Sequence, residues 1–112
     1  MTANDGVEFY VRDIFKDQSG ETVVVGIPNN GMPVKVGDRF ELRYEIDCDD
    51  VLNGVPNPIR RNCISVQLSV QRIDFMRKDV DKLPHGVTGG LYLSGAGLDG
   101  VIPTCFLRTA AR

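Results

Sequence analysis

The chain has 112 residues and a mass of 12.3 kDa, which is room for one domain and one hydrophobic core. A nucleotide-driven switch or motor needs a separate nucleotide-binding domain, for which this length leaves no room. The 13 Lys and Arg residues against 15 Asp and Glu give a net charge of −2. Proteins that coat nucleic acid usually carry a basic excess, so we do not expect sequence-independent coating, and a localised basic patch is left open.

The cysteines and the N-terminal residues set the expected compartment. Cys48, Cys63 and Cys105 are odd in number and too widely spaced for a zinc-ligand pair, which favours free thiols in a reducing environment. Residues 1–5 are polar and acidic rather than a secretory signal, and the apolar runs are too short to cross a bilayer. We therefore expect a cytoplasmic protein with no cofactor, no metal and no membrane partner.

Short alternating segments separated by glycine and proline indicate an all-β chain. The first expected strand contains Val7, Phe9 and Val11 and runs on towards Phe15. Residues 22–27 form a nearly continuous β-branched run, which is typical of a central strand rather than an exposed one.

Two longer segments show a period of two, which predicts strands with one apolar face and one solvent face. Their apolar positions are Phe40, Leu42, Tyr44 and Ile46 in the first segment, and Ile64, Val66, Leu68 and Val70 in the second. After the second segment the apolar phase moves to Ile73 and Phe75, which predicts a bulge or sharp bend near Gln71 and Arg72.

The remaining segments complete the predicted fold. Residues 91–93 and 101–107 are expected to be strands, and a turn of helix is expected within residues 76–83. Six or seven short strands with regular turns predict a small antiparallel barrel or a sandwich. Residues 7–108 are then one domain, preceded by a flexible N-terminus at 1–6 and followed by a tail at 109–112.

Residues 47–62 break the strand rhythm with charged and turn-forming residues, and are expected to be an exposed excursion. Asp47, Asp49 and Asp50 suggest a cation loop, but an EF-hand starting at Asp47 would have Val51 and Pro58 at its fifth and twelfth positions. The aspartates are therefore interpreted as solvated loop charge or as one sign of a complementary protein interface.

Two further motifs resemble catalytic or cofactor signatures. Residues 95–100 match GxGxxG, but strands are expected on both sides, whereas a dinucleotide site needs a following helix. His85 lies between Pro84 and Gly86 in an expected exposed turn, and no nucleophile elbow or HExxH motif surrounds it. Catalytic triads assemble in space, so spacing alone does not exclude one. We nevertheless expect no enzymatic activity.

Four segments in order carry a family resemblance. Residues 11–15 read Val-Arg-Asp-Ile-Phe, residues 20–26 read Gly-Glu-Thr-Val-Val-Val-Gly, residues 34–38 read Val-Lys-Val-Gly-Asp, and residues 76–78 read Met-Arg-Lys. This pattern resembles the second, β-barrel domain of the elongation factor Tu superfamily, over about residues 7–108. The resemblance implies a stand-alone, six- to seven-stranded antiparallel β-barrel of the translation-factor domain II type.

In that family the barrel helps to hold the aminoacylated 3′ end of transfer RNA. Asp13, Phe15 and Arg77 coincide with residues that line the family's pocket. Other pocket positions differ: Arg12 replaces a glutamate, Val25 a threonine and Thr88 an asparagine, which removes polar contacts that specify a ligand. The favoured interpretation of the retained residues is structural, with Asp13 as a turn or strand-end anchor and Phe15 as a core residue.

The function that we expect is a non-enzymatic binding module that recognises a protein partner, for example as a toxin inhibitor or immunity protein. Its expected contact residues lie in the excursion: Asp47, Asp49, Asp50, Arg60 and Arg61. The alternative is an RNA-binding module that contacts a transfer RNA acceptor end through Asp13, Phe15 and Arg77, with nucleic acid the less favoured partner. The oligomeric state is left open, a weak homodimer included.

Overall fold

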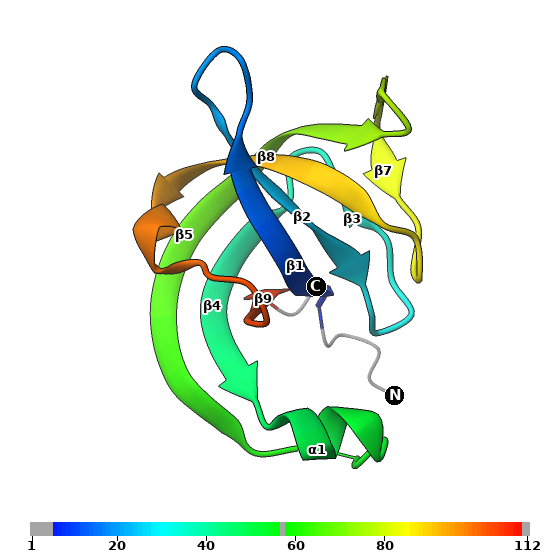
Figure 1. Cartoon of the computed structure of the whole chain (residues 1–112), viewed down its shortest axis with the longest axis vertical. Coiled ribbons are helices and arrows are strands. Elements are labelled where there is room, and N and C mark those ends of the chain that lie inside the picture. The colour runs from blue at the N-terminus through cyan, green and yellow to red at the C-terminus, as the bar shows by residue number, and fades with distance from the viewer. Residues whose placement is uncertain (1–5, 57, 111–112) are drawn as a thin grey trace.

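A computed structural model describes residues 6–56 and 58–110 (Figure 1). The strands in these ranges are β1 (Glu8–Lys16), β2 (Thr22–Pro28), β3 (Val34–Lys35), β4 (Arg39–Ile46), β5 (Arg60–Phe75), β6 (Lys78–Val80), β7 (Lys82–Leu83), β8 (Gly89–Ala96) and β9 (Phe106–Thr109). A short helix, α1 (Cys48–Leu52), lies between β4 and β5, and a 3-10 turn, η1 (Leu98–Gly100), lies between β8 and β9.

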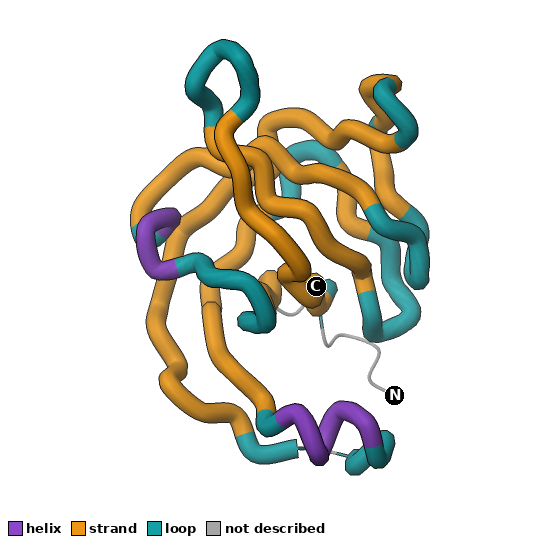
Figure 2. Tube along the Cα trace, in the orientation of Figure 1, coloured by secondary structure: helices purple, strands orange, loops and turns teal. Residues whose placement is uncertain are grey.

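The strands form a ring. Seven of them make one antiparallel sheet in the order β4-β9-β1-β2-β8-β5-β6, and β4 also pairs with β5, which closes the sheet on itself. Strands β3 and β7 form a separate two-stranded sheet. Figure 2 shows the strands wrapped around a common interior, with α1 at the far end of the β4–β5 hairpin. The all-β class and the six- to seven-stranded antiparallel barrel are therefore confirmed.

The core lies inside this ring. β2 pairs with both β1 and β8, so its β-branched run is central, as its composition predicted. The close β1–β2 pairing requires Gly26, because a Cβ at this position would collide with the Tyr10 carbonyl. The largest side chains with essentially no exposed area include Phe9, Phe40, Leu68, Ile73, Leu83, Leu91 and Leu107. Each such side chain contributes roughly 1.5–3 kcal/mol when it leaves water.

A bulge at Arg12 changes which residues of β1 face the core. Val11 pairs with Gly26 and Asp13 with Val25, so Arg12 has no partner in the ladder. The inward positions pass from Val11 to Ile14, and Phe15 turns outward with 50% of its surface exposed. The interpretation of Phe15 as a core residue is wrong for this reason.

β4 has a bulge of the same kind at Glu41. Phe40 faces the core, but Leu42 and Tyr44 pair with Arg108 and Phe106 on the outer face of the sheet. The predicted single inward face through Leu42, Tyr44 and Ile46 is therefore wrong beyond Phe40. Tyr44 is nevertheless fully buried, because other side chains cover it on the outer face.

The bulge brings Arg43 to the inner side of β4. It pairs with Leu107, a core residue, and is only 5% exposed. Its guanidinium donates hydrogen bonds to the carbonyls of Gly100 at 2.9 Å and Asn62 at 3.0 Å. Arg43 therefore ties β4 to η1 and β5 at the end of the barrel.

In β5 the predicted bulge is confirmed. Val70 pairs with Leu93 and Arg72 with Tyr92, so Gln71 is the extra residue, and the buried positions pass from Val70 to Ile73. Ile64 was expected to be buried but is 47% exposed. It lies where β5 extends beyond β8, whose pairing with β5 begins at Gln67.

Three local predictions are wrong. Residues 76–83 contain no helix: Met76 and Arg77 form a two-residue turn between β5 and β6, with φ of 53° and 65°, and β7 follows. The expected strand at 101–107 begins only at Phe106, after a turn that includes Thr104. The excursion of 47–62 is shorter than expected, because Arg60 already belongs to β5.

Candidate binding surfaces

A groove lies between α1 and the outer face of the barrel. Its apolar lining comes from Ile46 at the end of β4, Val51 and Leu52 on α1, and Tyr10 and Phe106 on β1 and β9. We call this site the α1 groove. It joins segments that are far apart in the sequence, because β9 pairs with both β1 and β4.

The floor of the α1 groove is an aromatic cluster. The rings of Tyr10 and Phe106 are 5.0 Å apart between centroids, and Phe106 stacks on Tyr44 at 5.7 Å. The Arg60 guanidinium lies 4.6 Å from the centroid of the Tyr44 ring. Aromatic and cation–π contacts of this kind hold side chains in fixed positions. Arg60, predicted as a partner contact, therefore supports this floor.

Large apolar side chains are exposed on α1, where Val51 and Leu52 line the groove, and in the loop that follows α1. Their exposed fractions are 48% for Val51, 77% for Leu52, 39% for Val55 and 70% for Ile59. We call these four residues the α1 patch. Single exposed apolar residues are ordinary, but a group of them beside an apolar groove is typical of an interaction surface.

The charged residues at this site divide into paired and unpaired groups. Arg61 and Asp47 form an ion pair at 2.9 Å, so these two predicted contacts largely neutralise each other. Asp49 and Asp50 lie in the first turn of α1, and their carboxylates make no ion pair or hydrogen bond among the described residues. The five predicted residues thus lie in one region; among the described residues Asp49, Asp50 and Arg60 have no ion pair, and Arg60 lies over the Tyr44 ring.

Thr104 lines the same groove in a strained conformation. Its φ is 75°, a value that β-branched residues rarely adopt, and its backbone N–H donates to the Val11 carbonyl at 2.8 Å. Strained residues of this kind concentrate at functional sites. Thr104 is therefore a further reason to regard the groove as a site.

A second surface covers the outer face of β1, β2, β8 and β5. The strand registers place Phe15, Val23, Tyr92 and Arg72 side by side in one row, which we call the outer-face row. The Arg72 guanidinium lies 4.0 Å from the centroid of the Tyr92 ring and pairs with Asp79 at 3.2 Å. The row therefore exposes the Phe15 ring and the Arg72 guanidinium, whereas Val23 and Tyr92 are only 3% and 9% exposed.

The three residues predicted for RNA binding lie on or near the outer-face row. Asp13 pairs with Val25 inside β1, so its expected position in a turn or at a strand end is wrong; its carboxylate accepts a hydrogen bond from the Ile14 N–H at 2.8 Å. Arg77 is exposed in the β5–β6 turn. Asp13 and Phe15 thus share one face, and Arg77 lies beyond the end of β5.

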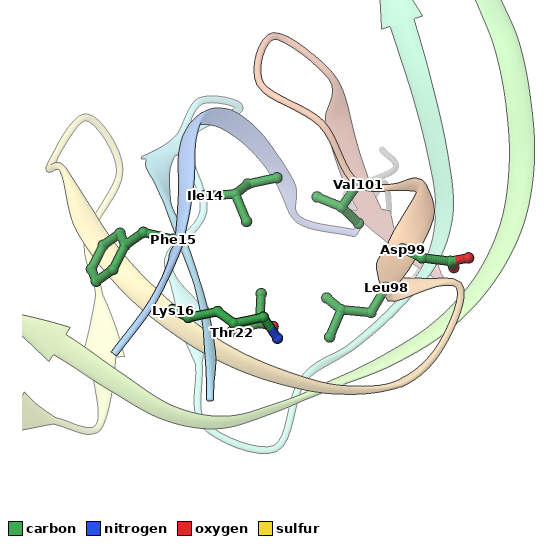
Figure 3. Close-up of a pocket in the computed structure, with 7 residues that line it drawn as sticks. All are labelled: Ile14, Phe15, Lys16, Thr22, Leu98, Asp99 and Val101. Atoms are coloured by element: carbon green, nitrogen blue, oxygen red, sulfur yellow. The ribbon is translucent and has the colours of Figure 1, made fainter. Parts of the chain in front are cut away.

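A separate pocket lies beside β1 and is lined by Ile14, Phe15, Lys16, Thr22, Leu98, Asp99 and Val101. Figure 3 shows Ile14, Leu98 and Val101 pointing towards one another across it, whereas the Phe15 ring points away. Ile14 and Leu98 pack against the core at this point. The pocket is therefore an opening into the end of the barrel, and Phe15 contributes its ring to the outer face instead.

Glu8 is a half-buried carboxylate beside the aromatic cluster. It accepts a hydrogen bond from the Tyr44 hydroxyl, and Arg108 lies 3.4 Å away. Burial raises the pKa of Glu8 above its usual 4.5, while the nearby charges of Arg108 and Arg60 oppose this shift. The Glu8 carboxylate helps to cover the Tyr44 side chain, and we interpret it as a structural contact.

The remaining motifs occupy structural positions. His85 is exposed, and its Nδ1 accepts a hydrogen bond from the Gly31 N–H at 2.8 Å. Residues 95–100 form the expected glycine-rich connection, running from the end of β8 through η1 rather than directly into a strand. Cys48 and Cys63 are exposed, and burial raises the pKa of the Cys105 thiol.

Two kinds of feature are absent from the described ranges, 6–56 and 58–110. These ranges contain no group of three or more His, Cys, Asp or Glu side chains placed to bind a metal ion. No helix within them is long and apolar enough to cross a membrane.

Sequence reasoning located the α1 region but missed its apolar components. The charges of residues 47–61 were visible, whereas Tyr10, Phe106 and Thr104 reach the groove only through strand pairing and a turn. The adjacent Val51 and Leu52 within an otherwise polar excursion were the available signal. For the outer-face row, the signal was an aromatic residue in each of two strands, Phe15 and Tyr92.

Comparison with known proteins shows the fold. No protein-family model and no curated protein matches the chain. Two solved structures of translation elongation factor SelB from Methanococcus maripaludis, the apo form and the complex with the GTP analogue GPPNHP, are similar to it. Each is 18% identical, with a TM-score of 0.59 over 98% of this chain and 20% of the SelB chain. The chain spans about a fifth of those proteins and has a translation-factor-like fold.

Proposed function

We propose that this chain is a non-enzymatic binding module that recognises a protein partner through the α1 groove and the α1 patch. The observation that carries the proposal is an apolar groove with an aromatic floor, lined by the exposed Val51 and Leu52 and followed in the sequence by the exposed Val55 and Ile59. An inhibitor or immunity protein for a toxin is one role of this kind.

The physical argument rests on where binding energy arises. Protein interfaces gain most of it from a few apolar and aromatic anchors buried at the centre, with polar groups at the rim. Leu52 and Ile59 are 77% and 70% exposed, so covering them would remove substantial apolar area from water. Their small contact with the barrel also means that they contribute little to folding.

This proposal can be tested by affinity capture with matched variants. We expect the Leu52→Asp/Ile59→Asp variant to keep the unfolding temperature of the wild type within a few degrees. In quantitative capture from cell extract, it should lose the proteins that the wild type enriches. Met76→Asp is the control, because Met76 is 78% exposed on the β5–β6 turn. Equal capture by the wild type and the double variant would contradict the proposal.

A second candidate function is binding of an RNA end on the outer-face row. The specific observation in its favour is that the bulge at Arg12 turns Phe15 outward beside Val23 and Tyr92. Bases stack on exposed aromatic side chains, and arginines such as Arg77 bind phosphates. The similar SelB chains are translation elongation factors, which agrees with this candidate at the level of the fold.

The RNA candidate has its own experiment. A fluorescent acceptor-stem RNA should bind at low ionic strength, release as salt is added, and lose affinity with Phe15→Ala and Arg77→Ala. The Leu52→Asp variant is the control here and should bind RNA like the wild type. Undetectable binding at low ionic strength would eliminate this candidate, because phosphate contacts are strongest under that condition.

A further inference from the structure

We infer that the partner protein held by the α1 groove also places the carboxylate of an aspartate or glutamate in a neighbouring cavity. This inference rests on the proposed function and adds a second, charged contact to it. The cavity is lined by Glu8, Ile46, Pro58, Arg60 and Arg108, so its two cations outnumber its single anion. We call this cavity the arginine pocket.

The arginine pocket adjoins the α1 groove. Ile46 lines both cavities. On β9, Arg108 lies two residues beyond Phe106, which lines the α1 groove, and residues two apart on a strand point to the same face. A partner segment that inserts an apolar side chain into the groove can therefore reach the arginine pocket with a side chain close to that anchor.

The fold already uses the carboxylate of Glu8. One of its oxygens accepts hydrogen bonds from the Tyr44 hydroxyl and from the Arg108 guanidinium, the latter at 3.4 Å. Its other oxygen accepts a hydrogen bond from the Asn29 amide at 3.0 Å. Glu8 therefore balances the charge of Arg108, and Arg60 is left without an ion pair within residues 6–56 and 58–110.

Most hydrogen-bond donors of the two guanidinium groups are also free. A guanidinium carries five N–H donors in a planar fork. Among the described residues, Arg108 donates one hydrogen bond, to Glu8, and Arg60 donates none. The contact of Arg60 is with the face of the Tyr44 ring, 4.6 Å from its centroid, which leaves the edges of the fork available.

A carboxylate is the group that matches these free donors. Its two oxygens accept parallel hydrogen bonds from a guanidinium fork, and its charge balances the unpaired cation. The remaining walls, Ile46 and Pro58, contact the methylene groups of such a side chain. A lysine or arginine at the same position would be repelled by Arg60 and would find few acceptors.

Two synthetic peptides that differ only in charge provide the test. Both contain the same leucine and phenylalanine, followed by two glutamates in one peptide and by two glutamines of nearly the same shape in the other. With the full chain, both peptides should shift the amide resonances of Leu52 and Phe106. The glutamate peptide should bind on the order of tenfold tighter and also shift the side-chain N–H resonances of Arg60 and Arg108. Added salt should reduce the difference in affinity.

Substitutions at Arg60 show whether this cation causes the preference. Arg60→Gln should bind the two peptides equally, whereas Arg60→Lys should keep part of the preference, because lysine retains the charge but not the planar fork. Arg77→Gln is the matched control, because Arg77 is also exposed and has no ion pair among the described residues. The control should keep the wild-type preference. Shifts of Leu52 and Phe106 that persist in Arg60→Gln show that the groove is intact.

The possible results separate this inference from the function on which it rests. Equal binding of both peptides by the wild type, or an unchanged preference in Arg60→Gln, would overturn the carboxylate contact and leave the α1 groove standing. Binding of neither peptide would overturn the inference, and capture with the Leu52→Asp/Ile59→Asp variant would then decide the function independently.

Two other occupants of the arginine pocket give different results. If acetate alone saturated the Arg60 and Arg108 shifts at concentrations below those of the glutamate peptide, the pocket would be a site for a free carboxylate. If light scattering showed a dimer that Arg60→Gln dissociates, the occupant would be a second copy of the chain. Either result would contradict the inference.

Discussion

Glu8 links the fold to pH through one side chain. Burial against the outer face of the sheet outweighs the attraction of Arg108 and Arg60, so the folded-state pKa of Glu8 lies above 4.5. The native state therefore holds this proton at a higher pH than the unfolded chain does. The contribution of Glu8 to stability is complete below pH 4.5 and is lost as the pH rises through the folded-state pKa.

Replacing Glu8 by glutamine tests this sign. The Glu8→Gln variant carries no charge at this position, but its amide oxygen can still accept the hydrogen bond from the Tyr44 hydroxyl. We expect the free energy of unfolding of Glu8→Gln to fall less than that of the wild type between pH 4.5 and neutrality. Urea denaturation at a series of pH values measures it, and parallel curves for the two proteins would contradict the assignment.

At the scale of elements, the bulge at Arg12 decides which phenylalanine of β1 supports the fold. Phe9 is fully buried and packs 6.2 Å from Phe40 between ring centroids, whereas Phe15 is 50% exposed. We expect Phe9→Ala to lower the free energy of unfolding by about 3–5 kcal/mol. Phe15→Ala should lower it by less than about 1 kcal/mol. Similar losses in the two variants, measured by urea denaturation, would show that β1 has no phase shift.

The β5–β6 turn stores backbone strain. Met76 and Arg77 both have positive φ, a conformation that costs residues other than glycine roughly 1–2 kcal/mol each. Asn-Gly is the preferred sequence for such a two-residue turn. Met76→Asn/Arg77→Gly should therefore raise the free energy of unfolding by about 1–2 kcal/mol. An unchanged free energy of unfolding, measured by thermal or urea denaturation, would show that this turn does not store the strain.

The bulges also explain which parts of the fold could be predicted from the sequence. The bulge in β5 was predictable, because the apolar positions visibly move from Val70 to Ile73. The bulges at Arg12 and Glu41 were not, because Phe15 and Tyr44 are apolar residues on the outer face. When side chains on the outer face of a strand are also apolar, the alternation of apolar and polar residues continues through a bulge. The sequence alone then shows no change of phase.

For the whole molecule, the ring of strands encloses the core, and the two candidate surfaces lie on its outside. The α1 groove combines β1, β4, β9 and the excursion, and the outer-face row combines β1, β2, β8 and β5. The charged residues near the α1 groove could be recognised from residue types alone. The same is true of Asp13, Phe15 and Arg77 on or near the outer-face row. The aromatic floor at Tyr10 and Phe106 could not be predicted, because it depends on pairing between distant strands.

The central claim is that the partner binds at the α1 groove, and hydrogen exchange tests it most directly. Amide exchange would be measured on the wild-type chain, free and bound to the protein that it captures. We predict slower exchange in the complex for residues 46–56 and 104–106, with the β1–β2 hairpin and the β5–β6 turn unchanged. Protection confined to residues 13–15 and 76–78, with α1 exchanging as in the free protein, would contradict the claim.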